Sequence, residues 1–372
     1  MNFRNLISKI HLWLGLVSGL LVFTIAITGC LYAFQEEIQN LTQPYRHVSV
    51  ENRAYLPPSY LQAVAQKELP EKLLHSIKYN ERDKAAEAIF FHFEDNYYYT
   101  IYLNPYNGAV LKVNDNYAGF FRFILNGHFY LWLPPAIGQP VAASATLIFV
   151  ILLLSGIILW VPKNIKLIKQ SLLFKWKKET SVKRKYYDLH KILGFYAGFV
   201  ALILACTGLV WGFQWFAKTL HTTAGGEKSL EYSSPLSDYS KSSSAIKSKA
   251  PVDSVYSVML QQYPSAKSIE VHPPETDSAV IAANANADAG TYWKIDYHYF
   301  DQYTFKEYDV NHIYGRIKDA NVADKLLRMN YDIHTGAIAG LPGKILAFCI
   351  SLMVASLPVT GFLIWWGRRK KS

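Results

Sequence analysis

Four long apolar stretches divide the chain. They cover residues 12–34, 141–161, 192–216 and 345–366, and each is close to or above the length of about 18 residues that can span a bilayer. The pattern predicts a multi-pass α-helical membrane protein. The first stretch is too long for a signal-peptide core, and no small-residue cleavage motif follows it, so we expect an uncleaved anchor.

The first and third apolar stretches follow one pattern. Each opens on a histidine, His11 or His190, and closes on a phenylalanine. The two copies also match at glycines four and eight residues after the histidine and at a Thr-Gly pair. These positions are Gly15, Gly19, Thr28 and Gly29 in the first copy, and Gly194, Gly198, Thr207 and Gly208 in the second. The repeat predicts two duplicated halves with a site between them.

A long polar segment follows each copy, and the two segments share a pattern of one helix and several strands. In the first segment we expect a helix over 59–69 and strands over 74–80, 88–94, 97–103 and 109–113. In the second we expect a flexible linker over 224–250, a helix over 252–263 and strands over 268–272, 278–286, 292–300 and 304–310. Each segment therefore predicts a small α+β module.

Each module leads into its next membrane helix through a second shared pattern. Arg122 stands six residues before His128, and Arg328 stands six residues before His334. Glycine and proline follow both histidines, and the helices then end on Ser155-Gly or Thr360-Gly and a tryptophan. Every predicted membrane helix is thus associated with one histidine.

The net charge of +10 is sorted by loop rather than spread over the chain. The 162–189 loop is rich in lysine and arginine and holds only Glu179 and Asp188 as acids, and the chain ends on a basic tail. Both polar modules carry slightly more acid than base. The positive-inside rule then predicts cytoplasmic N- and C-termini and exported modules, and the basic charge is not taken as a nucleic-acid signal.

The expected fold is a four-helix transmembrane bundle from two duplicated halves, with two small α+β modules. The expected parts are a membrane helix (1–34), a module (35–116), a His-containing lead-in and helix (117–161), a basic cytoplasmic loop (162–189), a third helix (190–216), a linker and second module (217–319), and a second lead-in, helix and basic tail (320–372).

Several motifs taken together resemble the PepSY-associated transmembrane-helix family. They are Tyr187-Asp-Leu-His190 with Gly194, Thr207-Gly-Leu-Val-Trp211, His128 with Leu131-Trp-Leu-Pro134, and Ile333-His-Thr-Gly-Ala337 with Gly340-Leu-Pro-Gly343. Within that family the chain looks most like the iron-regulated inner-membrane siderophore reductases, over nearly its whole length. The resemblance implies PepSY-like periplasmic modules and a bacterial inner-membrane location.

The four helix-associated histidines are the candidate ligands of two haem b groups. We expect His11 to pair with His190 on the cytoplasmic side and His128 with His334 on the exported side. Gly15, Gly19, Gly194 and Gly198 share the face of the first pair, where a flat macrocycle needs space. Candidate partners for the haem propionates are Arg122 and Arg328 on the exported side, and Lys9 and Arg184 on the other.

Other interpretations of these residues stay open. Histidines at a membrane interface are common, and small-xxx-small glycines usually mark close helix packing. His221 is an alternative ligand on the exported side, and Asp188 could accept the second ring proton of His190. Cys30, Cys206 and Cys349 suggest neither disulfides nor a zinc site, and no Cys-x-x-Cys-His motif for covalent haem is present.

The expected function is a membrane oxidoreductase that reduces ferric iron, held in a siderophore, on the periplasmic side. No catalytic side chain stands out, and electrons would come from a quinol or a separate reductase, because no flavin or nucleotide motif is present. The alternatives are a haem-free, membrane-anchored binding or regulatory protein and a component of a siderophore or iron transporter. Tyrosine-rich strands could line a pocket for chelated iron, although such strands are also ordinary half-buried ones.

Overall fold

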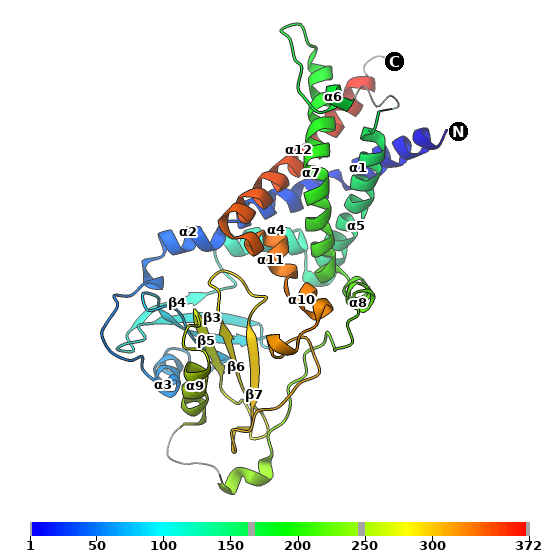
Figure 1. The fold of residues 1–372 in the computed structure, drawn as a ribbon. Coiled ribbons are helices and arrows are strands. Elements are labelled where there is room, and N and C mark those ends of the chain that lie inside the picture. Colours follow the sequence, from blue (N-terminus) through cyan, green and yellow to red (C-terminus); the bar gives the residue numbers. More distant parts are fainter. Residues whose placement is uncertain (1, 163–167, 245–249, 370–372) are drawn as a thin grey trace. The chain divides into compact units, whose positions relative to one another are not determined.

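The computed structural model describes residues 2–162, 168–244 and 250–369, which fold into two compact units (Figure 1). We call them the bundle unit and the sheet unit. The bundle unit comprises Met1–Gln35, Phe120–Thr219 and Asn330–Ser372, and the sheet unit comprises Glu36–Gly119 and Leu220–Met329. Each unit is therefore built from segments that are far apart in the sequence.

Four long helices form the bundle unit, and each is long and apolar enough to cross a membrane. They are α1 (Phe3–Tyr32), α5 (Pro135–Trp160), α7 (Val182–Gly212) and α12 (Gly340–Arg369). Both α1 and α7 pack against α5 and α12. Small buried residues such as Ala26, Ala197 and Ala355 line these contacts, which lets the helix backbones approach closely.

The ends of the long helices follow from local sequence. The side chain of Asn2 accepts a hydrogen bond from the backbone of Arg4 at the start of α1, and Ser181 caps α7 in the same way through Arg184. The third membrane helix begins at Val182, so the last part of the predicted 162–189 loop is helical. It ends at Gly212, earlier than the predicted residue 216, because Phe213 is extended before a new helix begins.

His128 and His334 lie on short separate helices, not on extensions of the membrane helices. These are α4 (Phe120–Tyr130), which packs against α1 and α5, and α11 (Asn330–Thr335), which packs against α7 and α12. Left-handed backbone at Leu131 and Trp132 turns the chain after α4. After α11 the turn uses Gly336, where a Cβ atom would collide with the Gly343 carbonyl group.

A single seven-stranded antiparallel sheet, in the order β4-β3-β2-β1-β5-β6-β7, forms the core of the sheet unit. Its strands are β1 (Ser76–Tyr79), β2 (Ala86–His92), β3 (Tyr97–Leu103), β4 (Val110–Asp115), β5 (Ser268–His272), β6 (Ile281–Asn286) and β7 (Asp296–Phe300). The two predicted modules therefore share one sheet. They meet where β1 pairs with β5, with Ile77 opposite Val271.

Two helices pack on the sheet, α3 (Pro58–Glu68) against β1, β2 and β4 and α9 (Pro251–Gln262) against β5 and β6. The core that these helices form with the sheet includes Leu61, Ile77, Phe90, Met259 and Ile281, all fully buried. Both helices and seven of the eight expected strands lie within a few residues of their predicted positions. The remaining short helices are α2 (Gln35–Thr42), η1 (Pro44–Arg46), α6 (Ile168–Ser171), α8 (Gln214–Thr223), η3 (Tyr239–Ser244), η4 (Ile317–Asp319), α10 (Val322–Arg328) and η5 (Ala337–Ala339).

The strand predicted over 304–310 is wrong. The Asp301 carboxylate accepts hydrogen bonds from the backbone of Tyr303 and Thr304, and Phe305 has left-handed backbone, so the chain turns after β7. Only a single bridge, between Phe300 and Glu307, forms there. Side-chain bonds from a short carboxylate to the backbone favour such turns over a strand.

The predicted linker over 224–250 is partly tied to the sheet unit. Ser229 bridges to His312, Leu236 bridges to Ala279, and the Ser237 backbone donates to the Ser278 carbonyl. Residues 245–249 of this stretch lie outside the described residues. The serine-rich composition predicted a flexible linker, but Ser229, Leu236 and Ser237 form backbone hydrogen bonds or bridges with the rest of the sheet unit.

Candidate functional site: two histidine pairs in the helical bundle

The first histidine pair joins α1 and α7. The imidazole centroids of His11 and His190 lie 6.2 Å apart, with the ring planes at 86°. Both residues are near the start of their helices, at the end of the bundle that carries the basic segments. The repeat alignment predicted this pairing, and the structure brings the two rings together.

The second pair joins the short helices α4 and α11. The centroids of His128 and His334 lie 6.0 Å apart, with the planes at 61°. His128 contacts α1 near Thr28, and His334 contacts α7 near Thr207. His11 and Thr28 on α1 are 17 residues apart, as are His190 and Thr207 on α7, which is roughly 26 Å along the helix axis at 1.5 Å per residue. That distance covers most of a hydrocarbon core of about 30 Å.

The Nδ1 atom of every paired histidine is held by a neighbouring helix. His11 Nδ1 lies 2.9 Å from Ser155 Oγ, and His190 Nδ1 lies 3.0 Å from Thr360 Oγ1. The other pair repeats the arrangement: His128 Nδ1 lies 3.3 Å from Thr28 Oγ1, and His334 Nδ1 lies 3.0 Å from Thr207 Oγ1. Backbone carbonyls of Leu357, Ile25 and Leu204 also lie within 3.1 Å of the Nδ1 atoms of His190, His128 and His334.

A glycine follows each of these hydroxyl residues and packs against the same ring. A Cβ atom at Gly29 would lie 3.2 Å from His128 Cε1, and one at Gly361 would lie 3.3 Å from His190 Cε1. The corresponding distances are 3.4 Å from Gly156 to His11 and 3.5 Å from Gly208 to His334. Each ring therefore rests in a Ser/Thr-Gly notch, in which the hydroxyl contacts Nδ1 and the glycine leaves room for Cε1.

This geometry fits a pair of imidazoles on one iron atom. Two imidazoles bound at metal–nitrogen distances of about 2 Å have ring centroids roughly 6 Å apart. Nδ1 is engaged in all four rings, and no Nε2 atom of the four bonds to any residue that the structure describes. Nε2 is thus the nitrogen left for a metal, with Nδ1 fixed by an outer partner as metal-bound histidines require. The donor set and spacing suit bis-histidine haem b at both levels.

The notches were missed in the sequence analysis, although their signal was present. The Thr-Gly pair was noted as part of the repeat, and Ser155-Gly and Thr360-Gly were noted only as helix ends. A hydroxyl residue followed by glycine occurs once in every membrane helix at a position facing a histidine. Searching for that dipeptide opposite each histidine would have found all four partners.

The four glycines predicted to face a macrocycle lie at contacts between helices. A Cβ atom at Gly15 would meet Leu152 at 3.8 Å, and one at Gly19 would meet Pro358 at 3.4 Å. Gly194 faces Leu357 and Gly198 faces Ile157 in the same manner, at 3.7 and 3.9 Å. These positions match the helix-packing alternative, since small residues at four-residue spacing let helices approach.

The predicted cytoplasmic-side partners have other contacts. Arg184 forms an ion pair with Asp188, with Nε and Oδ1 3.0 Å apart, and Asp188 also accepts a hydrogen bond from Trp176. Asp188 therefore does not order His190, whose Nδ1 contacts Thr360 and the Leu357 carbonyl instead. Lys9 is exposed on α1.

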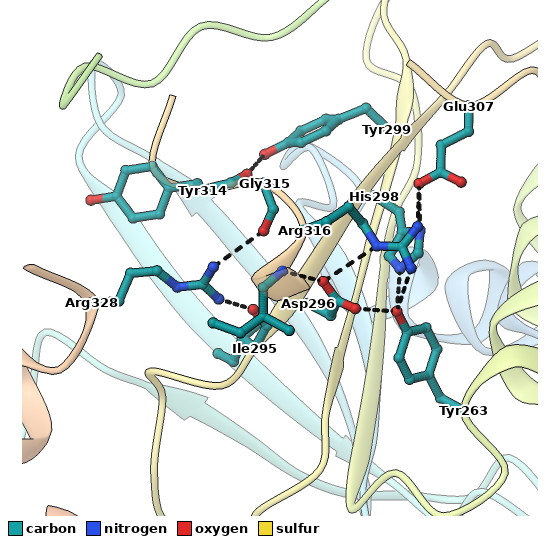
Figure 2. A network of polar contacts seen from close by, with 11 residues as sticks. Tyr263, Ile295, Asp296, His298, Tyr299, Glu307, Tyr314, Gly315, Arg316 and Arg328 are labelled. Atoms are coloured by element: carbon teal, nitrogen blue, oxygen red, sulfur yellow. Dashed lines mark hydrogen bonds and ion pairs between the residues drawn. The ribbon is translucent and has the colours of Figure 1, made fainter. Parts of the chain in front are cut away.

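Arg122 and Arg328, predicted to play the same role, belong to different units. Arg122 is half-buried on α4 in the bundle unit, whereas Arg328 is buried in the sheet unit. Figure 2 shows the Arg328 guanidinium directed at the carbonyls of Ile295 and Gly315. It also lies 5.4 Å from the Tyr297 ring, and burial lowers the pKa of this guanidinium. Through these contacts Arg328 links α10 to the backbone at Ile295 and Gly315 within the sheet unit.

The alternative ligand His221 is paired with a carboxylate. Its Nε2 atom lies 2.9 Å from Asp324 Oδ1, and both side chains are buried in the sheet unit. His334 is instead paired with His128. Of the two candidates, His128 is the one whose ring lies beside that of His334.

A second polar cluster lies between β7 and the end of α9 (Figure 2). His298 is bonded to Tyr263 through Nε2 and to Glu307 through Nδ1, each at 2.8 Å, and Arg316 bridges Glu307 and Asp296. Burial and the Arg316 guanidinium lower the pKa of His298, while Glu307 and Asp296 oppose that shift. In the described residues, no group of three or more His, Cys, Asp or Glu side chains is placed to hold a metal ion directly.

Replacing Gly29 with valine is expected to disrupt the pairing of His128 with His334. The new side chain would begin 3.2 Å from His128 Cε1, where no space for a branched residue remains, and would push the ring out of its notch. The matched control is Gly15→Ala, because a Cβ atom there makes an ordinary 3.8 Å contact with Leu152. Haem content per protein, measured by absorbance, should fall by about half in the first variant only. Equal losses would contradict the notch interpretation.

The comparisons with known proteins agree with the membrane architecture. No curated protein matches the chain. The family described as the PepSY-associated TM region matches residues 8–368, which include most of α1 and α12, all of α5 and α7, and the whole sheet unit. The chain therefore belongs to the PepSY-associated TM region family.

Proposed function

We propose that this protein is a two-haem membrane reductase that passes electrons across the bilayer to ferric iron held in a siderophore. Two histidine pairs carry the proposal, each with ring centroids about 6 Å apart. In every ring Nδ1 is held, and Nε2 has no partner among the residues that the structure describes. A single interfacial histidine would carry little weight. Four rings held in the same kind of notch, in two facing pairs, support one bound ligand at each pair.

The residues of the chain set the position and the electronic properties of each site. His11 with His190 and His128 with His334 would be the axial ligands, and the notch hydroxyls and carbonyls would hold each ring in the tautomer that presents Nε2. Bound haem b supplies a one-electron couple whose potential depends on its axial ligands, burial and hydrogen bonding. Hydrogen bonds from Nδ1 to carbonyl oxygens make an imidazole a stronger donor, which favours the oxidised metal.

The distribution of basic residues supports a direction of electron transfer from the first histidine pair to the second. The basic residues near the start of α7 and the end of α12 favour a cytoplasmic location for that end of the bundle in a bacterial inner membrane. The first histidine pair would then receive electrons, from a quinol or a separate reductase, and the second would deliver them on the periplasmic side. One electron converts one Fe(III) chelate to Fe(II), which hard oxygen ligands bind less tightly.

The test is spectroscopic and uses the purified full chain from cells supplied with haem. We expect a Soret band at close to two haems per chain and sharp ferrous bands after dithionite. Adding a ferric siderophore without oxygen should then remove the ferrous bands, with one chelate consumed per electron. A chain that folds and inserts but has no Soret band would contradict the proposal and favour the haem-free binding protein. A haem-loaded chain that no ferric chelate reoxidises would contradict the substrate alone.

A further inference from the structure

A cavity of about 310 Å³ opens between α7 and α12 in the bundle unit. Lys183 and Tyr187 line it from α7, and Leu363, Ile364, Gly367 and Arg368 line it from α12. The site is therefore at the N-terminal end of one membrane helix and the C-terminal end of the other (Figure 1). Its volume is at the lower end of the range for small-molecule sites, which begins at about 300 Å³.

Among the described residues, two cations and no acid line the cavity. Lys183 Nζ donates to the Gly367 carbonyl at 2.9 Å, which uses one of the three donors of the ammonium group and holds the others at the cavity. Arg368 is exposed, and no bond joins its guanidinium to a residue in the described parts of the chain. Nearby cations differ, since Arg184 is paired with Asp188 and Arg369 lies over Trp365.

The rest of the lining is apolar or aromatic. Leu363 and Ile364 lie about one turn before Arg368 along α12. The cavity therefore has cations near the helix end and apolar side chains one turn further into the bundle. A free inorganic anion would use only the cations. A molecule with an anionic head and an apolar body would use both parts. Basic pockets between membrane helices on the cytoplasmic side are suited to anionic lipid headgroups.

We propose that this cavity binds the headgroup phosphate of an anionic phospholipid, with Lys183 and Arg368 as its partners. The proposal does not depend on the proposed reductase function. It has a structural consequence for the first histidine pair. Lys183 and His190 are seven residues apart, so they lie on one face of α7, two turns from each other. On α12, Arg368 is likewise seven residues beyond Gly361, which packs on His190. A bound headgroup would join the two helices that hold His190.

The experiment compares two double variants of the full chain in detergent. K183Q/R368Q removes both cavity cations, and the matched control K185Q/R369Q removes the same charge from neighbouring positions outside the cavity lining. Phosphatidylglycerol binding is measured by native mass spectrometry, with phosphatidylcholine and inorganic phosphate as comparison ligands. At about 1 kcal/mol per cation, K183Q/R368Q should bind phosphatidylglycerol roughly thirtyfold more weakly, whereas the control should retain most of its affinity.

Each remaining outcome decides against the proposal. Equal phosphatidylglycerol affinity in the two double variants would overturn it, as would inorganic phosphate binding as tightly as the lipid. If K183Q/R368Q keeps the lipid but loses haem absorbance, the cavity serves the carboxylates of the cofactor instead. The single variant Arg368→Gln keeps the test valid if the double variant does not fold, because Arg368 is exposed; it should weaken lipid binding about fivefold.

Discussion

Replacing His11 with alanine is expected to remove about half of the haem bound by the chain, and His334→Ala is expected to remove the other half. The two residues belong to separate pairs, one joining α1 to α7 and the other joining α4 to α11. Since one imidazole alone does not saturate a bis-histidine site, loss of either member should empty or strongly perturb its own site only. The double variant H11A/H334A should therefore lack both Soret contributions. The measurement is haem per chain, together with the oxidised and reduced absorbance spectra.

The matched control is His92→Ala, which removes a histidine of the sheet unit whose ring contacts Asp95 and Tyr97. It should leave haem content unchanged. The ligand assignment is wrong if H11A and H334A both retain full haem content with unaltered spectra. A loss of both haems in each single variant would have a different meaning. It would show that the bundle needs both sites filled to fold, and Thr360→Val and Thr207→Val, which remove only the notch hydroxyls, would then separate ligation from folding.

The histidine pairing could be predicted because it rests on local and repeated signals. Apolar length located the four membrane helices, and the matching positions of His11 and His190 in two similar helices implied a common depth. The strands with strong alternation and the two helices that pack on them were also predictable. Each of these features depends on residues that are close together in the sequence.

The joining of the two halves in one sheet could not be predicted in this way. It depends on the pairing of β1 with β5, two strands that are far apart in the chain. Nothing in the sequence of either strand indicates which strand it pairs with. The same limit applies to the arginines. Arg122 and Arg328 occupy matching positions before a histidine, yet the sheet unit buries Arg328 against carbonyls of Ile295 and Gly315. Tertiary contacts, rather than sequence spacing, decided that difference.

Glycine makes two kinds of contact in the bundle, and only one of them could be recognised from the sequence. Gly15 and Gly194 allow helices to pack, whereas Gly29 and Gly361 make room for a histidine ring. Four-residue spacing identified the first kind. The second kind depends on which helix lies opposite, so it becomes visible only when the neighbouring helix is known.

Replacing Asp324 with asparagine is expected to cost the sheet unit roughly 3–5 kcal/mol of unfolding free energy, because it breaks a buried ion pair from one side. Asp324 is fully buried; it accepts hydrogen bonds from His221 Nε2 at 2.9 Å and contacts Lys228 Nζ at 3.3 Å. It also completes the capping box that starts α10, through the backbone of Asn321. An asparagine would leave the buried His221 ring and the partly exposed Lys228 ammonium group without a carboxylate. Hydrogen exchange of peptides spanning α8 and α10 measures the loss.

The pH dependence of this site gives a second readout. Burial by itself would raise the pKa of the Asp324 carboxyl, but the bonds from His221, the Asn321 backbone and Lys228 lower it below its ordinary value. A lowered carboxyl pKa contributes stability above the unfolded value of about 3.9, and that contribution is lost as the pH falls through the folded value. Asp324→Asn should remove this acid-sensitive part of the protection.

The control Lys228→Met keeps the His221 bond and should cost about 1 kcal/mol, since Lys228 is partly exposed. Equal costs for the two variants would contradict the assignment of Asp324 as the centre of this buried site.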